Sequence, residues 1–484
     1  MDSLLFLEYL YVPIIIGFCI HIVLNTKNTS KTLAYLLLVI FLPLLGIIIY
    51  LLLGINQRKN KLYSRKLLAD QDIDKSITDY FHSLNTAAFL SQNESLLRQE
   101  KTARFVAKDS FSPVLLHNDV KILNNGELTF PEIFHSIEKA KSHIHIEFYI
   151  IENDQTGKQL KELLIKKAQQ GIQVRIIYDD FGSMGIRNEY AEELRKYGVE
   201  IYPFMKLKFV QFANRVNYRN HRKIVIVDGI TSFVGGLNIS DRYRNDLNSK
   251  QHSYWRDTHI RIDGLATYSL QNIFLCDWNF AANQYLTPNE DFFPQIKEKS
   301  KFNKTIQIVS SGPDSENPTI MFALMQAIAS AQEEVLITTP YFIPSSSVLN
   351  ILKISAISGV KIKILVPFHS DSKIVGAATS AYFDDLLDVG IEIYQYKKGF
   401  IHSKTMVCDR EIAIIGTANM DIRSFDLNFE VNAHIYNPTI AQELAANFYD
   451  DINNADKINP AIWKERSVSE KLISNIAKLS SSLL

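Results

Sequence analysis

The sequence predicts an α/β protein of two similar lobes related by a pseudo-twofold repeat, preceded by an N-terminal transmembrane helical hairpin. Two apolar runs of membrane-spanning length open the chain. After them, short β-branched runs alternate with helical patterns, and this order occurs twice. We expect a hairpin over 1–55, a basic juxtamembrane linker over 56–105, a first lobe over 106–300 and a second lobe over 301–484.

The two N-terminal runs extend from Leu4 to Leu24 and from Leu33 to Leu53. Each has about the 20 residues that a helix needs to cross a bilayer. A cleaved signal peptide is the alternative interpretation, but the start MDSLLFLE has no basic segment and a second long apolar run follows at once. The sequence therefore predicts two membrane spans joined by a short loop.

A basic cluster follows the second run and predicts the orientation of the hairpin. Its members are Arg58, Lys59, Lys61, Arg65 and Lys66. Because positive charge stays on the cytoplasmic side, we expect the large C-terminal part to face the cytoplasm. The cluster either rests on anionic headgroups or acts only as a topology signal.

The overall composition excludes some classes of function. Lys plus Arg and Asp plus Glu both number 52, so the chain has no overall positive charge for nucleic acid. Only three cysteines are present, which argues against a disulfide framework or a cysteine-based zinc site. We expect a folded protein whose chemistry involves no thiol.

An internal repeat organises the chain from about residue 106 onward. The first copy contains AKSHIHIEFYI from Ala140, GIQVRIIYDD from Gly171 and YGVEIYPF from Tyr197. The second copy contains corresponding runs from Ala331, Gly359 and Val389. Buried strands alternating with helices fit these patterns, so each copy should form one lobe. Two related lobes could build one site from two half-sites.

The end of each copy carries the same motif, with histidine, lysine, aspartate, glycine and asparagine at identical spacings. The first copy has His221, Lys223, Asp228, Gly235 and Asn238; the second has His402, Lys404, Asp409, Gly416 and Asn419. Because side chains two apart on a strand share a face, each histidine and its lysine address one point. Lysines compensate phosphate charge, while one histidine attacks phosphorus and the other protonates the leaving oxygen. This chemistry needs no metal and no cofactor.

The duplicated H-x-K-x(4)-D pattern resembles that of the phospholipase D superfamily over nearly the whole chain. Longer strings, including NYRNHRKIVIVDG, YWRDTHIRIDG, TTPYFIP and GTANMDIRSFDLNFE, are similar to those of bacterial cardiolipin synthases. The resemblance implies transfer of a phosphatidyl group from one phosphatidylglycerol to another through a phosphohistidine, giving cardiolipin and glycerol. It also implies a bacterial cytoplasmic membrane location and phosphatidylglycerol and other anionic phospholipids as partners. A hydrolase that releases phosphatidic acid is the alternative.

The resemblance also implies roles for individual residues. His221 would attack, His402 would act as acid and then base, and Asp257 and Glu430 would orient the two histidines. From the motif residues themselves, we expect Asn238, Thr417 and Asn419 to contact the phosphate; Thr417 has no counterpart in the first copy, where Gly236 stands. Asp228 and Asp409 would act in the chemistry or, alternatively, hold the strand ends as turn residues.

A basic and aromatic stretch over 205–220 separates the first motif from the strand before it. It would either lie on the bilayer and guide lipid or pack on the protein as a surface loop. The second lipid substrate remains open between phosphatidylglycerol, phosphatidylethanolamine and a cytidine-diphosphate lipid, and so does the oligomeric state.

Overall fold

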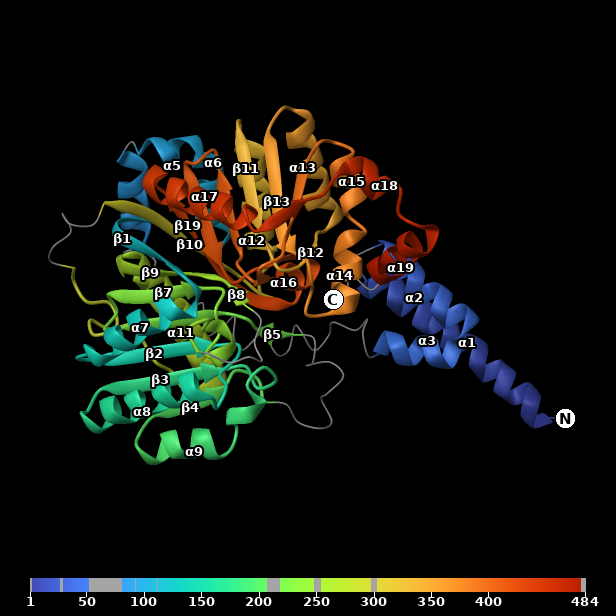
Figure 1. The fold of residues 1–484 in the computed structure, drawn as a ribbon. Coiled ribbons are helices and arrows are strands. Elements are labelled where there is room, and N and C mark those ends of the chain that lie inside the picture. Colours follow the sequence, from blue (N-terminus) through green and yellow to red (C-terminus); the bar gives the residue numbers. More distant parts are fainter. Residues whose placement is uncertain are drawn as a thin grey trace. The chain divides into compact units, whose positions relative to one another are not determined.

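The structure, a computed structural model, describes residues 2–26, 29–51, 81–91, 93–110, 112–206, 218–247, 254–296 and 303–479. The chain divides into two compact units (Figure 1). One contains Met1–Leu68 and Leu207–Asn217, and the other contains Ala69–Lys206 and Tyr218–Leu484. The basic cluster after the second apolar run and most of the 205–220 stretch lie outside the described residues.

The N-terminal unit consists of three described helices, α1 (Asp2–Asn25), α2 (Thr29–Phe41) and α3 (Pro43–Ile49). The first predicted span forms one helix, whereas the second is broken at Leu42. Pro43 causes this break because its ring disfavours a helical conformation of the preceding residue. The structure thus describes two helices, α2 and α3, within the run for which the sequence predicts one span. Across the described part of the chain, no helix combines the length and the apolar character that crossing a membrane requires.

The second unit contains both repeat copies. The first copy comprises β1 (Val114–Asn124), α7 (Asn125–Glu138), β2 (His143–Phe148), α8 (Gln155–Gln169), β3 (Gln173–Tyr178), α9 (Glu189–Lys196), β4 (Glu200–Pro203), β5 (Arg219–Asn220), β6 (Lys223–Val227), β7 (Thr231–Gly235), β8 (Tyr254–Arg256), β9 (Thr258–Gly264) and α11 (Ala266–Ala282). Short 3-10 helices lie at Met184–Ile186 and Asp241–Tyr243.

The second copy repeats this order with additions. It comprises β10 (Lys304–Ser311), α12 (Thr319–Ser330), β11 (Glu334–Thr338), β12 (Phe342–Ile343), α13 (Ser346–Ile357), β13 (Lys361–Pro367), α14 (Lys373–Ser380), α15 (Phe383–Leu387), β14 (Glu392–Tyr396), β15 (Gly399–Ile401), β16 (Thr405–Cys408), β17 (Ile412–Gly416), β18 (Met420–Asp421), α16 (Ile422–Asp426), β19 (Asn428–Tyr436), α17 (Pro438–Ile452), β20 (Ala455–Lys457), α18 (Pro460–Lys464) and α19 (Val468–Leu479).

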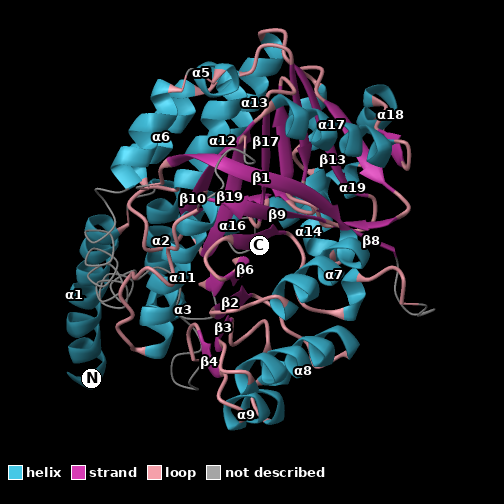
Figure 2. Cartoon of the chain, turned by 90° about the vertical axis from the view of Figure 1, so that its left-hand side faces the viewer, coloured by secondary structure: helices cyan, strands magenta, loops and turns pink. Residues whose placement is uncertain are grey.

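One sheet runs through both copies (Figure 2), in the order β4-β3-β2-β6-β7-β9-β1-β10-β19-β17-β16-β11-β13-β14-β20. From either edge inward, equivalent strands follow one another in the same order, apart from the additional β20. The two halves meet where β1 and β10 pair antiparallel. This symmetric strand order is what the sequence repeat predicts, and it supports two α/β lobes.

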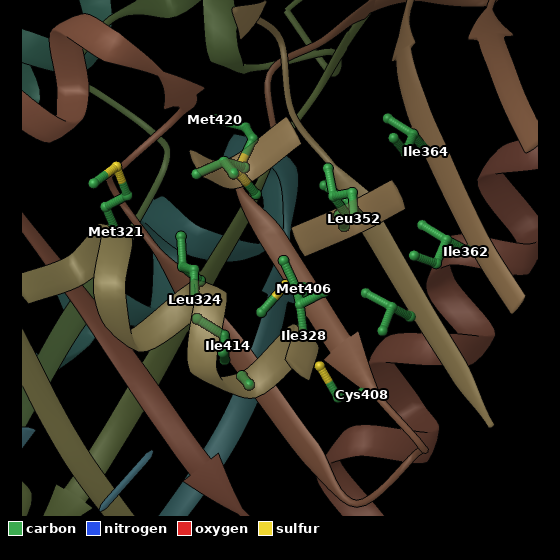
Figure 3. Close-up of a cluster of buried hydrophobic side chains, with 14 of the residues drawn as sticks. Met321, Leu324, Ile328, Leu352, Ile362, Ile364, Met406, Cys408, Ile414 and Met420 are labelled. Atoms are coloured by element: carbon green, nitrogen blue, oxygen red, sulfur yellow. The ribbon is translucent and has the colours of Figure 1, made fainter. Parts of the chain in front are cut away.

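Each lobe has its own apolar core. In the first, residues such as Ile146 and Ile176 on the sheet pack under helices α7 to α9. Figure 3 shows part of the second core, where Leu324 and Ile328 of α12 face Met406 and Ile414 of the sheet. Two further helices, α5 (Glu94–Arg98) and α6 (Glu100–Asp109), add Leu96 and Val106 respectively to this second core. The region 56–105, predicted as a linker, thus ends in core helices.

Candidate active site

His221 is positioned by strands of both lobes. It follows β5, which pairs in parallel with β19 of the second lobe. Its backbone N–H donates to the carbonyl oxygen of Phe429 at 2.9 Å, and its Nδ1 lies 2.9 Å from Oε2 of Glu430. The carboxylate therefore holds Nδ1 and leaves Nε2 as the ring nitrogen available to a substrate.

His402 has the equivalent environment with the lobes exchanged. It follows β15, which pairs in parallel with β8 of the first lobe. Its backbone N–H donates to the carbonyl oxygen of Arg256 at 2.7 Å, and its Nδ1 lies 2.7 Å from Oδ2 of Asp257. Each histidine is thus oriented by an acid from the opposite lobe. Neither lobe alone contains a complete histidine–acid pair.

The motif lysines lie against the backbone of their histidines. Lys223 Nζ donates to the carbonyl oxygen of His221 at 2.7 Å, and Lys404 Nζ donates to that of His402 at 2.5 Å. Lys404 Nζ also lies 3.0 Å from Nδ1 of His402. Both side chains are buried. Burial lowers the pKa of Lys223 to about 7 and that of Lys404 to about 8. Their charge is therefore lost at a lower pH than that of an exposed lysine, and a bound anion would favour the charged forms.

Burial also sets the charge of the histidines and acids. It lowers the pKa of His221 to about 4, against the opposing effect of Glu430, and lowers that of His402 well below its usual range. Burial opposes ionisation of Glu430, but His221 and Lys223 outweigh it and lower its pKa. For Asp257 burial prevails and raises the pKa to about 6. At neutral pH both imidazoles are therefore neutral, and a neutral imidazole is able to attack phosphorus.

The motif aspartates are not part of this site. Asp228 and Asp409 lie at the far ends of β6 and β16, each with a positive φ of 52°. The Asp228 carboxylate accepts the backbone N–H groups of Lys141, Ser142 and His143 at 2.8 to 3.0 Å. The Asp409 carboxylate accepts those of the three equivalent residues, 332–334, at 2.8 to 2.9 Å. Their predicted catalytic role is corrected to the alternative one, because both carboxylates hold the start of a neighbouring strand.

Thr417 also has a different role from the predicted one. Its buried hydroxyl donates to Glu430 Oε2 and accepts the backbone N–H of Val431, so it holds the orienting acid and does not line the cavity. In the first lobe a Cβ at Gly236 would lie 2.0 Å from Oδ1 of Asp257. The shorter acid lies against the backbone there and leaves no space for a side chain.

Both motif asparagines line the cavity. Asn238 Oδ1 accepts the backbone N–H of Ile150 at 3.1 Å, and its Nδ2 donates to the Tyr243 hydroxyl at 2.7 Å. Asn419 hydrogen-bonds Asp421, while its own buried Oδ1 has no partner among the residues that the structure describes. Asn238 is thus engaged by the protein, and Asn419 keeps an unsatisfied polar atom at the cavity.

Both histidines line one cavity of about 370 Å³. Aromatic rings flank them: Tyr149 lies 5.0 Å from the His221 ring, and Trp255 lies 5.5 Å from the His402 ring, centroid to centroid. Arg219 of the 205–220 stretch lines the cavity too, with its guanidinium 4.5 Å from the centre of the Phe181 ring. Arg219 is only 4% exposed, so this end of the stretch packs on the protein.

Several cavity residues were not anticipated from the sequence. They are Tyr149, Arg242, Tyr243, Asp371, Asp421 and Arg423. Tyr149 directly follows β2, and Tyr341 closely follows the equivalent β11. A tyrosine after the same strand in both copies is the sequence pattern that could have predicted Tyr149 as a cavity residue. Over the described ranges, no group of three or more histidine, cysteine, aspartate or glutamate side chains is arranged to hold a metal ion.

Comparison with known proteins gives concordant results. The family model "Cardiolipin synthase, PLD-like domain" matches residues 133–253 and 324–452, and the model "Phospholipase_D-nuclease N-terminal" matches residues 14–54. A cardiolipin synthase of Geobacillus sp. (strain WCH70) is 39% identical over 95% of this chain and 90% of its own. The major cardiolipin synthase of Bacillus subtilis (strain 168) is 39% identical over 95% and 94%.

A solved structure shares the fold. The crystal structure of phosphatidylserine synthase from Haemophilus influenzae Rd KW20 superposes with a TM-score of 0.59 at 16% identity. It covers 79% of this chain and 100% of the solved chain. This likeness supports the arrangement of two α/β lobes.

Proposed function

The chain belongs to the cardiolipin synthase family of the phospholipase D superfamily and is a phosphatidyltransferase, and from this premise we propose that it joins two phosphatidylglycerol molecules through a phosphohistidine. The observation that carries the proposal is the cross-lobe orientation of both histidines, each by one acid, at a single cavity. Two imidazoles facing one phosphate supply a nucleophile and an acid–base group.

In the first step, Nε2 of His221 attacks phosphorus and the bond from phosphorus to the glycerol oxygen breaks. Protonated His402 gives its proton to that oxygen, and glycerol leaves. The anionic phosphate favours protonation of His402, because a nearby negative charge raises the pKa of an imidazole. Lys223 and Lys404 compensate the charge that develops on the phosphate oxygens.

In the second step, neutral His402 removes a proton from the terminal hydroxyl of the second phosphatidylglycerol. The resulting oxygen attacks phosphorus, the bond from phosphorus to His221 breaks, and cardiolipin is released. Glu430 supports the assignment of His221 as nucleophile. Its lowered pKa keeps it ionised, and a carboxylate stabilises the positive charge of a phosphorylated imidazolium.

The product formed from pure phosphatidylglycerol vesicles tests this function. We expect cardiolipin and glycerol in equal amounts from the wild-type protein, and neither from His221→Asn. Phosphatidic acid as the main product would instead support the alternative hydrolase, in which water replaces the second lipid.

The N-terminal helices support a proposed membrane location. We propose that residues 1–55 lie in the bacterial cytoplasmic membrane as a hairpin, with the second unit on the cytoplasmic side. Large apolar side chains are exposed on these helices, among them Leu24 (77%), Phe41 (74%) and Leu44 (80%). Such surface is unfavourable in water and favourable in lipid.

Cell fractionation tests the location. We expect the full chain in the membrane fraction after an alkaline carbonate wash. A reporter enzyme that is active only in the cytoplasm, fused after residue 484, should be active. Release of the full chain by the wash, or a C-terminal reporter on the outer side, would contradict the proposal.

A further inference from the structure

The C-terminal helix α19 exposes its large apolar residues and buries its small ones. Ser474 and Ala477 are buried, at 8% and 9% exposure. The exposed face, here called the docking face, consists of Val468 (83%), Leu472 (58%), Ile473 (60%), Ile476 (56%) and Leu479 (84%). The spacing of three or four residues places most of these on one side of the helix. An amphipathic helix of a soluble domain normally shows the opposite arrangement.

The other face of α19 is already packed. α19 lies beside α14 in both views of the molecule (Figures 1 and 2). The Ser380 and Ser474 hydroxyl oxygens are 3.3 Å apart, and Lys478 Nζ lies 4.3 Å from the centre of the Tyr382 ring. Small residues at this seam let the helices approach closely. The docking face is therefore not the face by which α19 joins the second lobe.

The position of α14 relates this face to the active site. Ser372 and Val375, at the start of α14, line the cavity that contains both histidines. Ile374, between them in sequence, is 56% exposed, and Phe368 just before the helix is 42% exposed. One helix thus forms part of the cavity wall and also packs against the helix that carries the docking face.

We propose that the docking face inserts into the interface of an anionic phospholipid bilayer and so places the cavity beside the lipid headgroups. This proposal rests on the proposed function, because a diacyl lipid that places its phosphate in the cavity keeps its acyl chains in the bilayer. The charges agree: Lys471 on α19 and the exposed Lys373 on α14 suit anionic headgroups.

A fluorescent label at position 473 tests the insertion directly. In the full chain with Cys19→Ser, the remaining cysteines, Cys276 and Cys408, are buried, so Ile473→Cys is selectively labelled. In vesicles containing phosphatidylglycerol we expect a blue-shifted emission that spin-labelled acyl chains quench. The matched control is Ile357→Cys on α13, which is 72% exposed and should keep a solvent-like emission.

Other occupants of the face give other signals. A blue-shifted label that lipid does not quench would mean that protein covers the face, either the N-terminal helices or a second copy of the chain. A solvent-like label in the presence of vesicles would mean that nothing covers it. Either result would overturn the proposal.

Charge substitutions test the consequence for turnover. Leu472→Glu with Ile476→Glu should lower activity on vesicles on the order of tenfold or more, because burying carboxylates at the interface is unfavourable. Activity on dispersed short-chain phosphatidylglycerol should remain, which shows that the protein folds, and Ile357→Glu should change neither activity. Unchanged activity of the double variant on vesicles would contradict the inference. If the wild type made no cardiolipin, the proposed function would fail, while the label would still decide the docking.

Discussion

At the scale of single residues, the two half-sites differ in their acids. Glu430 is one methylene longer than Asp257, and the residue beneath each acid differs accordingly. Thr417 donates to Glu430, whereas Gly236 leaves space for the Asp257 carboxylate. The departure of Gly236 from the repeat, visible in the sequence, is thus a consequence of the shorter acid.

Replacing an orienting acid by its amide should reduce turnover strongly. Glu430→Gln and Asp257→Asn preserve volume but remove the charge that stabilises an imidazolium, so we expect kcat to fall about 10²- to 10⁴-fold. Thr417→Val removes only a hydroxyl and should lower kcat roughly tenfold. Steady-state kinetics on phosphatidylglycerol measure all three. Near-normal turnover of Glu430→Gln would show that this carboxylate does not assist His221.

The motif lysines predict how activity depends on pH. Because burial lowers their pKa values to about 7 and about 8, raising the pH through this range removes positive charge from the free enzyme's site. We expect kcat/KM to fall between about pH 7 and pH 9 and kcat to fall less, since bound phosphate raises the lysine pKa values. A profile of kcat/KM that stays flat to pH 9 at constant ionic strength would contradict this.

At the scale of elements, the repeated aspartates join strands rather than catalyse. Asp228→Ala removes the acceptor of three backbone N–H groups, so the free energy of unfolding should fall by about 2 to 4 kcal/mol. Asp228→Asn keeps one acceptor oxygen and tolerates the positive φ, so its free energy of unfolding should fall by less than that of Asp228→Ala. We expect kcat per folded molecule to change less than about threefold. Denaturant unfolding and activity, measured on the same preparations, distinguish this structural role from a catalytic one. If Asp228 were catalytic, its replacement would abolish turnover and leave the stability unchanged.

The strands of the repeat could be predicted from the sequence, since runs such as VRIIY and IKILV are β-branched and bounded by turn residues. The histidines, lysines and acids also followed from the duplicated motif and its resemblance. Two features could not be predicted. The short strands β5, β8 and β15 pair with the opposite lobe, and such distant pairings leave no local pattern. The break at Pro43 was missed because the apolar run continues through it.

At the scale of the whole molecule, catalysis depends on the junction of the lobes. The pairing of β1 with β10 continues one sheet across both cores, and β5 and β8 cross to the other lobe beside the histidines. A backbone hydrogen bond from each histidine to the opposite lobe fixes the two imidazoles at one cavity. The duplication therefore yields one site from two halves.

The charge in this site comes from side chains, so activity should not require an added metal. Two lysines and two histidines supply the groups that bind phosphate and transfer protons, and the described residues hold no metal-ligand cluster. We expect full activity after dialysis against EDTA, measured at constant ionic strength. Loss of activity that zinc or magnesium restores would require a different mechanism.

The covalent intermediate is the most direct test of the central claim that the two histidines divide the chemistry. His402→Asn should still accumulate a phosphatidyl adduct on His221, because the group that activates the second alcohol is missing, whereas His221→Asn should form none. Mass spectrometry of peptides after incubation with phosphatidylglycerol locates the adduct. An adduct on His402 in the His221→Asn protein, or no phosphohistidine in either variant or in quenched wild type, would contradict the assignment.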